Sequence, residues 1–135
     1  MRRAAHYADG WLPYMYTPEQ LAESIEQIKK FGEDAGRDMR DFTPGVFLFT
    51  AVHEDQAQGF KMANDKLSVQ YAQDFTKLTA KYTLAGNPDH CRARLKEYLD
   101  AGARFVFVST ACPDDYIDRN LALIAEEIVK PSRGA

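Results

Sequence analysis

Two stretches of the chain are apolar at consecutive positions rather than at alternate ones. Residues 46–52 and 105–109 are short, rich in β-branched and aromatic side chains, and followed by small or polar residues. Such runs predict strands that are covered on both faces, which is typical of parallel sheets. A third, very short strand is predicted at residues 10–12, where Pro13 closes it.

The segments between these strands carry apolar residues at the three- and four-residue spacing of amphipathic helices. The clearest helix starts at Thr17, which can cap the first turn, with Pro18 at the first helical position; Gly36 is a suitable end. A second clear start is Asn87 followed by Pro88. The helix that starts at Asn87 is predicted to run to residue 99. Further helices are predicted over residues 2–7, over a long stretch that starts at 53–55 and runs to 82 with a break near 73–74, and over 116–129.

The order of these elements predicts an α/β fold of three parallel strand–helix units, with an extra helix inserted before the third strand. We expect one domain over residues 1–130 and a frayed tail at 131–135. A sheet of three strands leaves two open edges and only a partial core. The predicted core consists of Leu21, Ile25, Ile28, Phe47, Phe49, Val106, Val108, Leu121 and Ile124.

Four segments together resemble one known family. They are residues 2–13 (RRAAHYADGWLP), 17–21 (TPEQL), 84–88 (LAGNP) and 100–104 (DAGAR). Their order and spacing are similar to the last third to half of luciferase-like monooxygenases, which are flavin- or F420-dependent enzymes built on a TIM barrel. The resemblance implies a partial (β/α)₈ barrel and, as cofactor, FMN or F420.

The same resemblance limits what the chain is expected to do alone. In the family the active face is assembled from all eight strands, and the glycine-rich end of the fifth strand would precede Arg2. We therefore expect the C-terminal part of an oxidoreductase that is not catalytically complete by itself. The partner would be the missing N-terminal half of the barrel or a second copy of the chain. The alternatives are a non-catalytic association module with this fold and, third, a generic α/β protein without flavin ancestry.

Candidate site residues come from the rule that parallel α/β folds carry function at the carboxyl ends of their strands. Trp11, Ser109 and Thr110 are candidates for cofactor binding, and His53 is the one candidate for proton transfer. Each also has a structural interpretation. Trp11 suits a core aromatic residue, the two hydroxyl residues suit helix capping, and His53 suits a solvated loop. No metal-ligand cluster is found in the sequence.

Composition and charge limit the partners, the location and the cysteine chemistry that are expected for this chain. The 135 residues carry a net charge of -3, which argues against nucleic acid as a partner. No apolar run is long enough for a membrane span or a signal peptide, so a cytoplasmic protein is expected. The only cysteines are Cys91 and Cys112. Cys91 lies on the apolar face of its helix and suits a core position. Cys112 lies in a loop and is more open to a reactive role, although no activating base is near it in the sequence.

Overall fold

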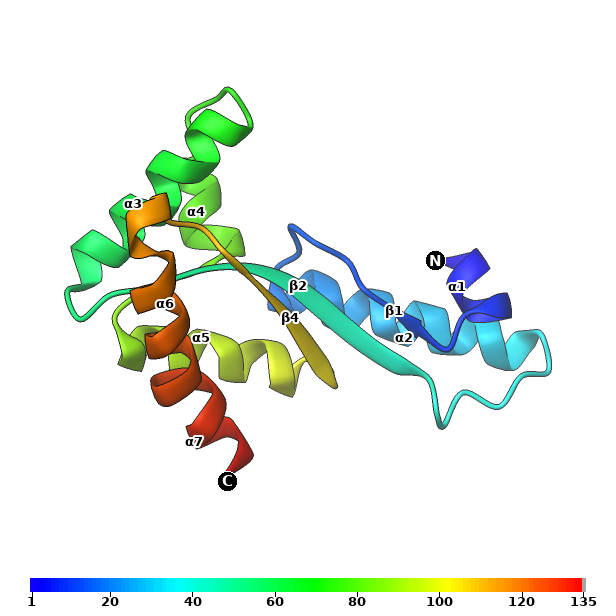
Figure 1. The fold of residues 1–135 in the computed structure, drawn as a ribbon. Coiled ribbons are helices and arrows are strands. Elements are labelled where there is room, and N and C mark those ends of the chain that lie inside the picture. The colour runs from blue at the N-terminus through cyan, green and yellow to red at the C-terminus, as the bar shows by residue number, and fades with distance from the viewer. Residues whose placement is uncertain (135) are drawn as a thin grey trace. The chain divides into compact units, whose positions relative to one another are not determined.

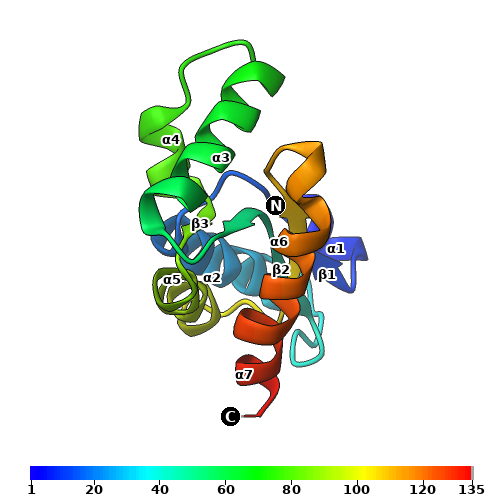
Figure 2. The same ribbon diagram turned by 60° about the vertical axis from the view of Figure 1, so that its left-hand side comes forward.

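The computed structural model describes residues 1–134. Most of its helices and strands are labelled in Figure 1, and the short strand at 84–86 is labelled in Figure 2. The described chain groups into two compact units. The first consists of residues 1–47 and 97–107, and the second of residues 48–96 and 108–134. Ala135, the last residue of the expected tail, lies outside the described residues.

The strands are β1 (Gly10–Trp11), β2 (Thr43–Val52), β3 (Leu84–Gly86) and β4 (Phe105–Thr110). The other three strands all pair with β2, and β1 and β3 do so in the parallel sense. For β4, hydrogen bonds run from Arg104 N to Pro44 O and from Ala111 N to Thr50 O, at 2.8 and 2.9 Å. These bonds advance together along both strands, so β4 is parallel to β2 as predicted.

Strand β3 is a correction to the sequence prediction, which placed strands only at residues 10–12, 46–52 and 105–109. Its three residues are buried, and they pair with β2 from Thr50 to Val52. Gly86 ends the strand at a φ of +145°, in a region that favours glycine. A strand of three residues is too short to show periodicity, so only its pairing partner reveals it.

In the first unit, the predicted start of α2 (Pro18–Asp34) is confirmed as a complete capping box. Gln20 N donates to Thr17 Oγ1 at 3.1 Å, and Thr17 N donates to Gln20 Oε1 at 3.0 Å. Gly36, at a φ of +78°, follows the end of the helix as expected. Helix α1 (Arg2–Tyr7) packs against α2. A cluster of buried side chains lies in this unit, formed by Ala5, Ile28, Met39 and Phe42.

In the second unit, the long helical stretch breaks where the sequence suggested. Helices α3 (Gln56–Gln70) and α4 (Thr76–Tyr82) lie side by side, as Figures 1 and 2 both show. Asp74 makes the break, because its carboxylate accepts from the backbone N–H and the hydroxyl of Thr76 at 3.0 and 2.6 Å. Helix α5 (Pro88–Asp100) begins as predicted, with Asn87 Oδ1 accepting from His90 N at 2.8 Å.

The last predicted helix is divided into several segments. A 3₁₀ turn, η1 (Asp114–Tyr116), leads into α6 (Ile117–Leu123), a π-helical segment η2 (Ile124–Val129) and α7 (Lys130–Arg133). The burial of Ile124 is confirmed. The prediction that Leu121 is buried is wrong, because its side chain is 48% exposed while Asn120 is fully buried. Helical structure also continues to Arg133, inside the expected tail.

Strand β4 differs most from its prediction. Phe105 and Phe107 are 41% and 52% exposed, and Val106 and Val108 are only half-buried. Among the described strands only β2 pairs with β4, so the second edge of β4 has no strand partner within residues 1–134. The run of apolar residues predicted the strand correctly, but the expected burial of both its faces is wrong.

A close approach between α3 and β3 yields a testable expectation. A Cβ atom on Gly59 would lie 2.7–2.8 Å from backbone atoms of Gly86. Gly59→Ala is therefore expected to lower the free energy of unfolding by about 1–3 kcal/mol, despite the better helix propensity of alanine. Urea titration measures this change, and Gln58→Ala on the exposed neighbouring position is the control. Equal stability of the Gly59→Ala variant would contradict the close approach.

Candidate functional site

In the first unit, Trp11 stands at the carboxyl end of β1. Its indole contacts the ring of Tyr16 edge to face, with ring centres 5.4 Å apart, and packs on the buried cluster formed by Ala5, Ile28, Met39 and Phe42. Tyr98 Oη donates to the backbone carbonyl of Tyr16 at 2.7 Å and so holds this loop. Trp11 is therefore a packed aromatic residue that is only half-buried.

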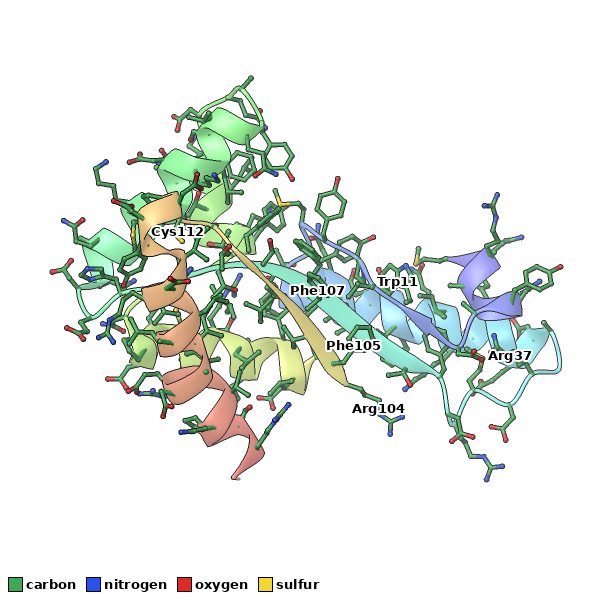
Figure 3. The ribbon with its side chains drawn as sticks, viewed as in Figure 1. Trp11, Arg37, Arg104, Phe105, Phe107 and Cys112 are labelled. Carbon is green, nitrogen blue, oxygen red and sulfur yellow. The ribbon has the colours of Figure 1, made fainter. Side chains whose placement is uncertain are left out.

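A row of aromatic rings lies over the first half of β2 and the start of β4. Phe47 and Phe107 stack with centres 5.1 Å apart and an angle of 10°, and Tyr14 meets Phe47 edge to face at 6.4 Å. Figure 3 shows Phe105 and Phe107 along β4. Partly exposed aromatic rings of this kind can stack against another planar ring system. Sequence reasoning placed Phe47 in the core and did not recognise this surface.

In the second unit, Ser109 and Thr110 are half-buried at the carboxyl end of β4. Helix capping, their structural interpretation, is not observed, because the N-cap of η1 is Pro113. The two hydroxyl groups therefore stay candidates for hydrogen bonds to a ligand. Trp11 belongs to the first unit, so the three candidate cofactor contacts are divided between the two units.

His53 follows β2 and lies against Tyr116, with ring centres 5.7 Å apart and an angle of 26°. Its Nδ1 accepts a hydrogen bond from Asp55 N at 2.9 Å, so in the neutral imidazole the proton is on Nε2. Tyr116 Oη donates to the Val52 carbonyl at 2.9 Å, and burial raises the pKa of this phenol above its usual value. The imidazole is thus oriented as a hydrogen-bond donor at the end of β2.

Asn120 is the residue at this end that sequence reasoning missed. Its Oδ1 accepts from Val52 N at 2.9 Å, and its Nδ2 donates to Thr50 O at 3.1 Å and contacts Cys112 Sγ at 3.4 Å. The side-chain amide satisfies backbone groups at the carboxyl end of β2 where strand pairing ends. The available signal was a polar residue at helical spacing from Ile117, Ile124 and Ile128.

Both cysteines are buried thiols. Burial raises the pKa of Cys91 to about 12, and its Sγ donates to the Gly86 carbonyl at 3.7 Å. Cys112 is 1% exposed, and burial is the main cause that raises its pKa as well. A neutral thiol is a poor nucleophile. The structural interpretation of Cys91 therefore holds, and the suggestion that Cys112 is open to a reactive role is wrong.

Residues 1–134 contain neither a metal-ligand cluster nor a membrane-spanning helix. No group of three or more histidine, cysteine, aspartate or glutamate side chains there is arranged to hold a metal ion. Within the same residues, every helix is too short or too polar to cross a bilayer.

The parallel strand–helix order and the candidate residues at strand carboxyl ends can be compared with known proteins. The sequence profile described as luciferase-like monooxygenase matches residues 1–104. The chain belongs to this family. No curated protein sequence matches it significantly.

Solved structures related to this luciferase-like chain show the same fold at low sequence identity. An F420-dependent secondary alcohol dehydrogenase, in complex with an F420–acetone adduct, superposes with a TM-score of 0.74 at 14% identity, over 95% of this chain and 44% of that one. Riboflavin lyase, with modified FMN and riboflavin, superposes with a TM-score of 0.71 at 8% identity, over 98% of this chain and 40% of that one. The F420-dependent tetrahydromethanopterin reductase from Methanopyrus kandleri superposes with a TM-score of 0.70 at 17% identity, over 96% of this chain and 47% of that one.

The luciferase-like chain therefore spans less than half the length of each of these three enzymes. Its parallel strand–helix units correspond to part of their fold, and its own sheet is open. The predictions of the family and of a partial barrel-like α/β fold are confirmed.

Proposed function

We propose that this chain forms the C-terminal portion of a flavin- or F420-dependent oxidoreductase and supplies one part of the cofactor pocket. The observation that carries the proposal is the superposition of about the whole chain on less than half of enzymes described with F420 or FMN. In such enzymes the bound cofactor supplies the redox chemistry, and the protein supplies binding and orientation. FMN and F420 both remain candidates.

The residues of this chain fit a flat, oxygen-rich cofactor in part. The partly exposed, stacked rings of Phe47 and Phe107 would offer a surface for a planar ring, and the half-buried Trp11 would add a further aromatic contact. The hydroxyl groups of Ser109 and Thr110 would donate hydrogen bonds to ring carbonyl or phosphate oxygens. His53, with its proton on Nε2, is the candidate donor to an oxygen of the cofactor or substrate.

A partner is part of the same proposal. The exposed Phe105 and Phe107 and the open edge of β4 favour a covering chain, which would be the remaining barrel strands or a second copy. With that partner, residues 1–130 would belong to one barrel-like domain. A cytoplasmic location fits the reduced thiols of Cys91 and Cys112.

The test is a titration of FMN and F420 into the purified chain, followed by assays of reduced-cofactor oxidation. We expect no saturable binding below about 100 µM, because contacts from one side of a ring leave little net affinity. Turnover should be at background, since misplacement by about 1 Å alone costs roughly a hundredfold in rate. Addition of a segment that completes the barrel should restore both binding and turnover. Stoichiometric binding and turnover by the chain alone would contradict the proposal.

The exposed β4 aromatics also favour the second candidate function, a non-catalytic association module. Light scattering separates it from the first candidate when combined with the cofactor assays. A stable homo-oligomer that neither binds cofactor nor responds to any barrel-completing segment would support the module. Recovery of cofactor binding on addition of such a segment would exclude it.

A further inference from the structure

A cavity of about 550 Å³ lies within the first unit, and all the residues that line it belong to that unit. It is bounded by the end of α2, the loop into β2 and the loop from α5 into β4. Its apolar lining includes the buried Met39 and Phe42, together with Pro44 and Leu99. Its volume lies within the usual range for small-molecule sites.

Six charged side chains surround this lining, and three of them are already engaged. Arg37 donates to three backbone carbonyls within residues 4–8, at 2.6–3.3 Å, and so holds the end of α1. Arg40 pairs with Asp38 at 2.6 Å, which lowers the pKa of that carboxyl. Arg40 and Asp38 therefore neutralise each other, and Arg37, whose guanidinium also lies 3.8 Å from the Asp9 carboxylate, has a structural role.

Lys29, Glu33 and Arg104 complete the rim. Within residues 1–134, the side chain of Arg104 makes one long hydrogen bond, to the Arg40 carbonyl at 3.5 Å, and neither Lys29 nor Arg104 forms an ion pair. Figure 3 shows Arg104 projecting from the start of β4 and Arg37 from the loop after α2. Cationic side chains therefore outnumber acidic ones around this cavity, although the chain as a whole is acidic.

The side chains of Lys29 and Arg104 are not needed as hydrogen-bond donors to the backbone carbonyls at the ends of α2 and α5. Arg37 N donates to the Gly32 carbonyl of α2 at 2.9 Å, and Ala103 N donates to the Tyr98 carbonyl of α5 at 3.2 Å. These bonds satisfy carbonyls at the C-terminal ends of both helices by local turns. Two cations beside an apolar surface are thus left for a ligand.

We propose that this cavity binds a small organic anion with an apolar body, such as an aryl phosphate or aryl carboxylate. The guanidinium of Arg104 would bind two oxygens of the anion in its planar fork, and Lys29 would supply the second charge. The apolar body would lie on Met39, Phe42 and Leu99. The site is separate from the proposed cofactor pocket and does not depend on it.

The experiment follows amide signals of the ¹⁵N-labelled chain by NMR during titration with phenyl phosphate, inorganic phosphate and benzyl alcohol. Phenyl phosphate should shift the signals of Gly102, Ala103 and Arg104 with a Kd on the order of 1 mM, which suits its size. Inorganic phosphate lacks the apolar ring and benzyl alcohol lacks the anionic group, so each should bind at least several-fold more weakly. Added salt should weaken phenyl phosphate binding, because the charged contacts are exposed.

Variants decide whether the named residues form the site. Arg104→Gln should weaken phenyl phosphate binding about tenfold or more, and Lys29→Gln by a smaller factor. Arg3→Gln, an exposed cation on α1 outside the cavity, is the control and should bind like the natural chain. The amide spectrum shows whether each variant folds. If Arg104→Gln does not fold, the affinity of Lys29→Gln tests the proposal instead. Unchanged affinity in a folded variant, or no localised shift at about 10 mM ligand, would overturn the proposal.

Discussion

Replacement of Asn120 by alanine is expected to lower the free energy of unfolding by about 3 kcal/mol. The substitution removes the acceptor of Val52 N–H and a donor to the Thr50 carbonyl, both at buried positions of β2. Thr50 O keeps its bond from Ala111 N, but Val52 N–H loses its partner. A buried donor without a partner costs about 1–3 kcal/mol, and the lost side-chain volume adds to that cost.

Leu121→Ala is the matched control for this prediction. Leu121 is adjacent in sequence and has the more hydrophobic side chain, but it is 48% exposed. Its replacement should change stability by no more than about 0.5 kcal/mol. Urea unfolding of both variants measures the difference. A larger loss for Leu121→Ala than for Asn120→Ala would show that the last helix presents the opposite face to β2.

Alkaline pH is expected to destabilise the chain through Cys91. The folded state holds the pKa of this thiol at about 12, against an ordinary value of 9.0. The unfolded thiol therefore loses its proton at lower pH than the folded one. Its contribution to stability is complete below pH 9.0 and is lost progressively as the pH rises through about 12. By about pH 10.5 the loss attributable to this thiol should reach about 2 kcal/mol.

Other groups titrate in the same range, so the measurement is a comparison of variants. The free energy of unfolding is measured from about pH 8 to about pH 10.5 for the natural chain and for Cys91→Ala. The variant starts less stable because of the lost buried sulfur, but its decline with pH should be shallower by about 2 kcal/mol over the range. Parallel declines would show that Cys91 ionises as readily in the folded state as in the unfolded one.

The candidate site was predictable only where local rules apply. Ser109, Thr110 and His53 lie at strand carboxyl ends as expected, since the residues that follow a parallel strand are known once the strand is known. The stacked pair of Phe47 and Phe107 was not predicted, because it depends on the register between two strands about 60 residues apart in sequence. The orientation of the His53 imidazole depends on one backbone N–H, that of Asp55, and spacing alone does not reveal it.

Elements with local signals could be predicted from the amino-acid sequence. Thr17 and Gln20 form their capping box, Asn87 caps α5, and the apolar run of residues 46–52 is part of a strand, because these outcomes depend on neighbours within a few residues. Other features depend on contacts between segments far apart in the chain. Strand β3 exists only through its pairing with β2. Asn120 rather than Leu121 faces β2, where its amide forms hydrogen bonds with backbone groups that a leucine side chain cannot form. Phe105 and Phe107 are exposed because burial depends on what lies across the sheet edge, and the apolarity of a strand does not specify that neighbour.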